Sequence, residues 1–320
     1  MGLKEVLKTN PVTKGLYANL KVRKDKKAHD NLFDYRGRFI NRSKGTEYVC
    51  IVLAGYKDYL YPAVFARLKN YAPDDMDVCV VTSGKFCETI NRICEENNWS
   101  YLSTEENNVC LVQNVAISLH PHAKFIFKLD EDIFIAKGFF DALKRAYKHS
   151  EEGEYFPGVA APLIPINGYG HVRVLEKLGL TEEYCRRFGT LKYAAGHERP
   201  IESSPEAAKF FWGEGGVIPS IDEMNELFSK GPVEERAVGI RFSIGAILFD
   251  RMIWEKMGYF YVNRKAVGLG RDEEQLCSYC CLNSRPIVVS ENVVVGHFSF
   301  GPQNEAMKEY YESHKDRFAF

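Results

Sequence analysis

The 320-residue sequence predicts an α/β fold with a mainly parallel central sheet and helices on both of its faces. Short runs of Val, Ile, Leu and Cys alternate with helical patterns along the first half of the chain. Because these runs are apolar at every position, both faces of the predicted strands are expected to be buried. Hydrophobic residues make up 45% of the chain, which is enough for a sizeable core.

The regular alternation begins at residue 48. Strands are predicted over 48–53, 77–82, 99–102 and 124–129, and helices over 58–71, 86–97 and 109–119. Ligands of such sheets bind at the carboxyl ends of the strands, so the turns that follow the strands form the candidate site. These turns are Ala54-Gly55-Tyr56, Ser83-Gly84-Lys85 and Asp130-Glu131-Asp132.

The second half has a less regular pattern. Residues 165–240 are rich in Gly, Pro and Glu, and we expect a long irregular segment that is functional or mobile. Regular patterning around it predicts a helix over 139–148, a strand over 159–164, a further element over 243–249, helices over 251–257 and 272–281, and strands over 287–290 and 292–295.

The first 45 residues differ from the rest in charge. They hold twelve Lys or Arg and four Asp or Glu, a local charge of +8 in a chain whose net charge is −1. We expect a basic arm over 1–45, which could touch an anionic membrane surface or be simply solvated. The balanced overall charge gives no indication of nucleic acid as a partner.

The sequence also bears on the cellular compartment. No stretch approaches the roughly 20 apolar residues that span a bilayer, and the amino terminus lacks the apolar core of a signal peptide. The nine cysteines are an odd number and lie mostly in apolar runs, as Cys50 and Cys79 do. These features favour reduced thiols in a cytoplasmic protein, with peripheral contact at the inner membrane face left open for the arm. Cys277 and Cys280 lack a second ligand pair, so a buried helix face is expected there rather than a metal site.

The triplet Asp130-Glu131-Asp132 is the strongest chemical signal. It follows the apolar run Phe125 to Leu129, so its carboxylates lie at the end of a buried strand. If strand alternation continues, Asp130 and Asp132 face one way and Glu131 the other. Neighbouring carboxylates beside an apolar core repel each other and are costly to desolvate, and a hard divalent cation removes that cost. The triplet indicates a Mg²⁺ or Mn²⁺ site, with a solvated turn as the alternative.

The order of elements resembles that of glycosyltransferases of the GT-A fold, a family 2-like branch of the nucleotide-diphospho-sugar transferase superfamily, over about residues 47–300. That family places an Asp-x-Asp motif after its fourth strand, and Asp130-Glu131-Asp132 occupies this place. Its inverting members carry an acidic base at a helix start, where this chain has Gly270-Arg271-Asp272-Glu273-Glu274. Some members add a late histidine as a metal ligand, where this chain has His297.

The resemblance implies a metal-dependent enzyme of polysaccharide biosynthesis. It would move a sugar from a nucleotide-diphosphate donor to a hydroxyl of a glycan or lipid-linked glycan. Residues 46–320 would form one catalytic domain, with a nucleotide-binding half over 46–135 and an acceptor-binding half over 136–320. UDP-sugar is the default donor, although Thr82-Ser83-Gly84-Lys85 replaces the Asp-Asp-Gly-Ser turn of many inverting relatives.

The same resemblance assigns roles to residues. Asp130, Asp132 and His297 would hold Mn²⁺ or Mg²⁺, and the imidazole favours Mn²⁺. Asp272 would be the general base of an inverting reaction and Glu273 its reserve, although the helix macrodipole also favours acids at a helix start. Residues expected to bind the donor are Ala54, Gly55, Tyr56, Ser83, Lys85, Asn114, Asp130, Glu131, Trp212 and Glu214.

Two of these expectations have alternatives. Trp212 lies in a glycine-rich segment with Glu214 and could stack on a sugar ring, or it could anchor a loop to the core. Lys128 is expected to face away from Asp130, where it could meet phosphate or lie on the surface.

Three other functions stay open. A retaining glycosyltransferase would share the metal site without needing Asp272. A sugar nucleotidyltransferase would need a longer and more basic loop than Ala54-Gly55-Tyr56-Lys57 to grip a triphosphate. A non-catalytic sugar-binding module would need neither buried carboxylates nor an acidic helix start.

Overall fold

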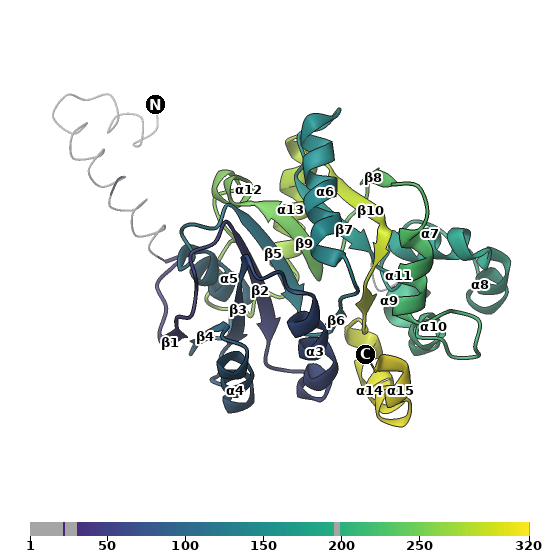
Figure 1. The fold of residues 1–320 in the computed structure, drawn as a ribbon, viewed down its shortest axis with the longest axis horizontal. Helices are drawn as coiled ribbons and strands as arrows, with labels where there is room; N and C mark the ends of the chain where they lie inside the picture. Colours follow the sequence, from purple (N-terminus) through teal and green to yellow (C-terminus); the bar gives the residue numbers. More distant parts are fainter. Residues whose placement is uncertain (1–21, 23–30, 195–198, 320) are drawn as a thin grey trace, which may run out of the picture.

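A computed structural model describes residue 22, residues 31–194 and residues 199–319 of the chain. Its centre is a nine-stranded sheet with the strand order β1-β4-β3-β2-β5-β9-β7-β10-β8 (Figure 1). These strands are β1 (Gly37–Ile40), β2 (Tyr48–Ala54), β3 (Met76–Ser83), β4 (Ser100–Thr104), β5 (Phe125–Asp130), β7 (Val159–Leu163), β8 (Glu235–Val238), β9 (Ala246–Asp250) and β10 (Ile287–Val294). A separate pair joins β6 (Ile133–Phe134) to β11 (Gly296–His297).

Most neighbouring strands of the large sheet are parallel. The strands β4, β3, β2 and β5 run in one direction, and β7 is parallel to β10. The strands β1, β9 and β8 are antiparallel to their neighbours. The predicted α/β class with a mainly parallel sheet is therefore confirmed.

Helices cover both faces of the sheet. On β5, Phe127 packs against Phe139 and Phe140 of α6, whereas the next residue, Lys128, lies near Asp272 of α13 on the opposite face. The helices are η1 (Asp58–Leu60), α3 (Tyr61–Tyr71), α4 (Glu88–Glu96), α5 (Val109–Ser118), α6 (Phe139–Glu152), α7 (Gly170–Leu178), α8 (Thr181–Phe188), α9 (Pro200–Ser203), α10 (Pro205–Phe211), α11 (Ile221–Ser229), α12 (Arg251–Lys256), α13 (Arg271–Leu282), η2 (Gly301–Gln303), α14 (Asn304–Ser313) and α15 (Lys315–Phe318). Among the described helices, none has the length and apolar character that crossing a bilayer requires.

Two sequence predictions about the second half are wrong. Residues 165–240 are not a long irregular segment, because α7, α8, α10 and α11 occupy much of it. These helices are short and several are followed by glycine, as α7 is by Gly179 with φ 69°. The segment therefore has the glycine-rich composition that is usual for a loop. The two strands predicted over 287–290 and 292–295 are one strand, β10, whose register against β7 shifts between Ser290 and Val294.

Part of the predicted basic arm belongs to the sheet. Residues 37–40 form β1, which pairs with β4. Just before β2, the Asp77 carboxylate accepts hydrogen bonds from the backbone N–H groups of Lys44, Gly45 and Thr46, at 2.6–3.1 Å. These bonds fix the entry of the chain into β2. Residues 1–21 and 23–30 of the arm lie outside the described residues.

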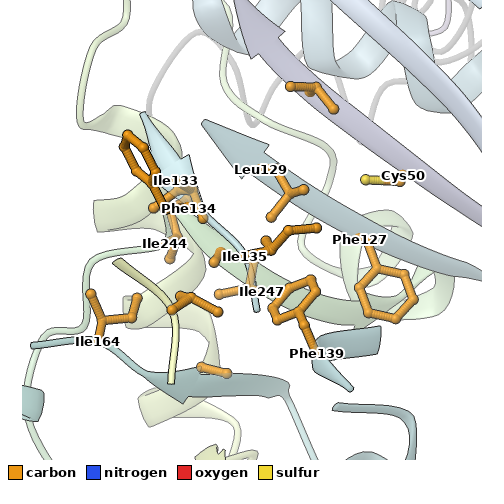
Figure 2. Packing of buried hydrophobic residues seen from close by; sticks show 14 of the residues in the cluster. Cys50, Phe127, Leu129, Ile133, Phe134, Ile135, Phe139, Ile164, Ile244 and Ile247 are labelled. Atoms are coloured by element: carbon orange, nitrogen blue, oxygen red, sulfur yellow. The ribbon is translucent and has the colours of Figure 1, made fainter. Parts of the chain in front are cut away.

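Buried side chains pack around β5 next to the acidic triplet. Figure 2 shows buried side chains of several elements meeting below the end of this strand. Those labelled are Cys50, Phe127, Leu129, Ile133, Phe134, Ile135, Phe139, Ile164, Ile244 and Ile247. Each of the nine cysteines is a free thiol.

Candidate functional site

The candidate site lies where the strand order reverses. The first strand of the parallel set, β2, has β3 on one side and β5 on the other, which makes the gap between β2 and β5 a switch point of the kind where α/β sheets bind ligands. In the register of these two strands, Leu53 pairs with Asp130. The turns after β2 and β5 are therefore side by side, as the sequence predicted.

Glu131 ties these two turns together. Its Oε2 accepts a hydrogen bond from the Gly55 N–H at 2.7 Å, and both of its carboxylate oxygens lie 3.0 Å from the Tyr56 nitrogen. Burial raises the pKa of Glu131, against the opposing effect of these N–H groups. Gly55 has a φ of 130°, which favours glycine in this turn. The structure therefore places Glu131 in a supporting role beneath the predicted donor-binding turn.

Asp132 faces two nitrogen groups. Its Oδ2 lies 2.5 Å from the Lys57 ammonium and 3.5 Å from His297 Nε2. The carboxylate is buried, which by itself would raise its pKa. The charges of Lys57 and His297 outweigh burial and hold the pKa of Asp132 well below its usual range.

His297 is oriented by the short sheet of β6 and β11. In this pair His297 is opposite Ile133, and the Phe298 N–H donates to the Asp132 carbonyl at 3.0 Å. His297 Nδ1 lies 3.2 Å from the Ile166 carbonyl oxygen. Since a carbonyl only accepts, Nδ1 carries a proton and Nε2 is the nitrogen turned to Asp132. This arrangement is typical of histidines that bind metals through Nε2.

Asp130 has a different partner from Asp132. Its Oδ1 lies 2.7 Å from the buried Lys128 ammonium. Burial raises the pKa of Asp130 to about 6, against the lowering effect of Lys128. The expectation that Lys128 faces away from Asp130 is wrong, because residues two apart on a strand share a face. Asp130 and Asp132 do not face the same partners, because β5 ends at Asp130 and strand alternation ends with it.

Asp272 lies close enough to this pair for its charge to act on the pKa values of both Lys128 and Asp130. It lies buried in the first turn of α13, and its Oδ2 accepts a hydrogen bond from Gln113 Nε2 on α5 at 2.9 Å. Burial alone would lower the pKa of Lys128, but the charges of Asp130 and Asp272 raise it. Glu273 instead pairs with Arg241 at 2.5 Å. Sequence reasoning missed Gln113 as the partner of Asp272, although it is one of two amides in a largely apolar helix.

The turn after β3 adds an exposed aromatic and basic edge. The Tyr56 hydroxyl donates to the Ser83 carbonyl at 2.6 Å, and Lys85 Nζ lies 4.4 Å from the centre of the Tyr56 ring. The predicted residues Tyr56, Ser83 and Lys85 are thus brought together. Ala54 ends β2 beside them, opposite Thr82.

Two other predicted donor-binding residues have structural roles. Asn114 is fully buried and its Oδ1 accepts from Trp254 Nε1 at 2.9 Å and from the Phe260 N–H at 3.0 Å. Trp212 is also buried and donates from Nε1 to the Phe298 carbonyl at 3.1 Å. The core-anchor alternative for Trp212 is the one that the structure supports. Glu214, two residues later, is exposed.

The residues present fit a divalent ion only in part. Within residue 22 and residues 31–194 and 199–319, no three His, Cys, Asp or Glu side chains are grouped so that they could hold a metal. Asp132 and His297 supply one oxygen and one nitrogen ligand, while Asp130 is turned to Lys128. Mg²⁺ and similar ions are often bound by one or two carboxylates together with substrate phosphates and water. The pair therefore fits an ion that completes its shell with a diphosphate.

No protein-family model and no curated protein sequence matches this chain. Among solved structures, mannosyltransferase PcManGT from Pyrobaculum calidifontis, in complex with GDP-Man and Mn²⁺, is 13% identical with a TM-score of 0.48, over 93% of this chain and 69% of that one. S. aureus TarS is 10% identical with a TM-score of 0.46, over 85% and 64%. GalNAc-T7 with UDP, GalNAc and Mn²⁺ is 11% identical with a TM-score of 0.47, over 85% and 51%. The chain thus spans about half to two thirds of the length of these structures, and the likenesses assign no function to it.

Proposed function

We propose that this chain is a metal-dependent glycosyltransferase of the GT-A type. It would move a sugar from a nucleoside diphosphate donor to a hydroxyl of a glycan or lipid-linked glycan, with inversion at the anomeric carbon. The observation that carries the proposal is the buried Asp132–His297 pair at the switch point between β2 and β5. Asp272, which Gln113 binds, lies near Asp130 and Lys128 at the end of β5.

The donor diphosphate would lie over the turns after β2 and β3. Lys57 and Lys85 provide positive charge there, and Glu131 holds the backbone of residues 55 and 56 in place. Asp132 and His297 would hold Mn²⁺ or Mg²⁺, which when bound neutralises charge on the departing diphosphate. UDP remains the default nucleotide, with GDP as the first alternative to test.

Asp272 would act as the general base. Gln113 binds its Oδ2, so Oδ1 is the oxygen that an acceptor hydroxyl would meet. As the acceptor oxygen forms its bond to the anomeric carbon, the bond from that carbon to the diphosphate oxygen breaks. The hydroxyl proton passes to Asp272, and the nucleoside diphosphate leaves. Glu273 is a poorer candidate because Arg241 already pairs with it.

Features away from the site support the setting of this reaction. Nine free thiols favour a reducing compartment such as the cytoplasm. The positive charge of residues 1–45 would favour contact with an anionic inner membrane face, which is where a lipid-linked acceptor would be met.

A panel of nucleotide sugars with Mn²⁺ tests the proposal through the release of nucleoside diphosphate. We expect one donor to be turned over, and its product to have the inverted anomeric configuration by NMR. Retained configuration would favour the retaining reaction instead. Thermal stabilisation by a nucleoside triphosphate alone would favour a nucleotidyltransferase, and stabilisation by free sugar without metal would favour a binding module.

A further inference from the structure

The ammonium group of Lys57 already lies against Asp132 Oδ2, the oxygen that would bind a metal ion. Lys57 Nζ lies 2.5 Å from Asp132 Oδ2, the same oxygen that His297 Nε2 approaches to 3.5 Å. The Asp132 side chain is 7% exposed and the Lys57 side chain 19%. A divalent ion that bound Asp132 and His297 would therefore have to take the place of the ammonium group.

The fold holds Lys57 in this position. The two residues before it, Gly55 and Tyr56, donate their backbone N–H groups to Glu131. On its other side, the Lys57 carbonyl accepts from the Leu60 N–H at 3.0 Å and so begins η1. The ammonium lies 6.0 Å from the centre of the Phe298 ring, next to His297. These hydrogen bonds fix the backbone before and after Lys57. The Lys57 side chain therefore reaches Asp132 without movement of the turn after β2.

Because the Lys57 side chain is partly exposed, it can leave Asp132 without crossing the core. Asp132 is enclosed, but the lysine tip lies at the rim where the turns after β2 and β5 meet. A four-carbon side chain can turn from Asp132 to a group bound just outside it while its backbone stays in place. A diphosphate bound over the β2 turn would be such a group, and it carries enough negative charge for both a lysine and a divalent ion.

We infer that Lys57 is an exchangeable counter-cation of Asp132. In the donor-free protein it neutralises the buried carboxylate and competes with a divalent ion. When the ion enters with a diphosphate, the ammonium moves from Asp132 to the diphosphate oxygens. This inference rests on the proposed function and makes Lys57 a donor-binding residue of that site. It follows that ion and nucleotide bind with positive cooperativity, because the free protein is mostly in the lysine-paired state.

Binding of Mn²⁺ to the whole protein, followed by the EPR signal of the free ion, tests this inference without turnover. Lys57→Gln keeps a hydrogen-bond donor beside Asp132 but removes the charge. We expect it to bind Mn²⁺ at least tenfold more tightly than the wild type without nucleotide. Lys57→Arg keeps the charge and should bind like the wild type. The matched control is Lys308→Gln, because Lys308 lies 5.1 Å from the centre of the nearby Tyr59 ring and has no contact with Asp132 among the described interactions.

The second half of the experiment adds UDP and GDP in turn. In the wild type, the matching nucleotide should tighten Mn²⁺ binding at least tenfold, and in Lys57→Gln this gain should largely disappear. If Lys57→Gln binds Mn²⁺ no more tightly than the wild type while Mn²⁺ and nucleotide still bind together, the inference is overturned and the proposed function stands. If the wild type binds Mn²⁺ neither alone nor with nucleotide, both are overturned. Thermal unfolding of each variant confirms that it is folded.

Discussion

Gly296 packs against the buried Trp212 and directly precedes His297 in β11. Its replacement by alanine therefore tests whether β11 positions His297. A Cβ atom at residue 296 would lie 2.5 Å from Trp212 Cη2 and 3.0 Å from Ile221 Cγ1. The tryptophan has no room to withdraw, because Phe298 binds its Nε1 and the ring of Phe318 lies 4.6 Å away. The backbone of β11 would therefore have to shift.

The expected cost follows from the overlap. Carbon atoms pack best about 3.5–4.0 Å apart, so a contact at 2.5 Å must be relieved by movement. Forcing an extra methyl group into a packed core costs about 1–3 kcal/mol, and we expect Gly296→Ala to lower the free energy of unfolding by about 2 kcal/mol. In a chain of 320 residues that lowers Tm by about 3 °C. Because His297 follows directly, stabilisation by Mn²⁺ and nucleotide should fall as well.

Urea unfolding measures the change in the free energy of unfolding, and Gly301→Ala is the matched control. A Cβ at Gly301 would meet no atom within 4 Å, so this variant should unfold like the wild type. Trp212→Phe removes the ring atoms that clash, and in that background Gly296→Ala should cost less. Equal unfolding midpoints for Gly296→Ala and Gly301→Ala would refute the reasoning.

Three further predictions concern the site and its support. Asp272→Asn should abolish sugar transfer but keep donor binding, while Glu273→Gln should retain turnover; near-normal turnover in Asp272→Asn would remove the base assignment. Burial lowers the pKa of His171 to about 4, so below its ordinary value of 6.5 the unfolded chain binds a proton that the folded chain does not. The free energy of unfolding should therefore fall by about 2 kcal/mol from pH 7 to pH 5, and urea unfolding of His171→Phe should lack that loss. Glu131→Ala should speed amide hydrogen exchange at Gly55 and Tyr56, which lose their acceptor; unchanged exchange would contradict the supporting role of Glu131.

The first half of the fold could be predicted because its strands are buried on both faces. The strand predicted over 77–82 is observed over Met76–Ser83, and that over 48–53 over Tyr48–Ala54. Continuous apolar runs of this kind leave little freedom in element type or boundary. The convergence of the turns after β2 and β5 follows from parallel strand pairing, so the position of the candidate site could also be predicted.

The partner of Asp130 follows from strand alternation, which puts Lys128 on the same face, but the partners of Glu131 and Asp132 could not be predicted. The strand ends at Asp130, so the orientations of Glu131 and Asp132 depend on the turn that follows and not on alternation. Their partners come from residues far away in sequence, such as Lys57, which lies 75 positions before Asp132. Nothing in the local pattern around Lys57 or Gln113 indicates an acidic neighbour, because that neighbour is brought close only by the tertiary fold.

Trp212 shows how glycines can suggest the wrong environment. The glycines that follow it in sequence suggested an exposed, flexible binding loop. The position that matters most for this side chain is Gly296 on β11, far away in sequence, where the missing side chain leaves room for the indole ring. Gly296 therefore makes the buried position of Trp212 possible. This role of Gly296 could be recognised only once the position of β11 in the fold was known.

The most direct test of the Asp132–His297 site is the thermal stabilisation of wild type and Asp132→Asn by Mn²⁺ with a nucleoside diphosphate. At about 100 times the dissociation constant, a ligand adds about 2.7 kcal/mol to the stability of the folded state. For a chain of 320 residues the wild-type Tm should rise by about 4 °C. We expect no such rise in Asp132→Asn, with the variant still folded in buffer alone. An equal rise in both proteins would contradict the assignment of Asp132 as the residue that holds the ion and its diphosphate.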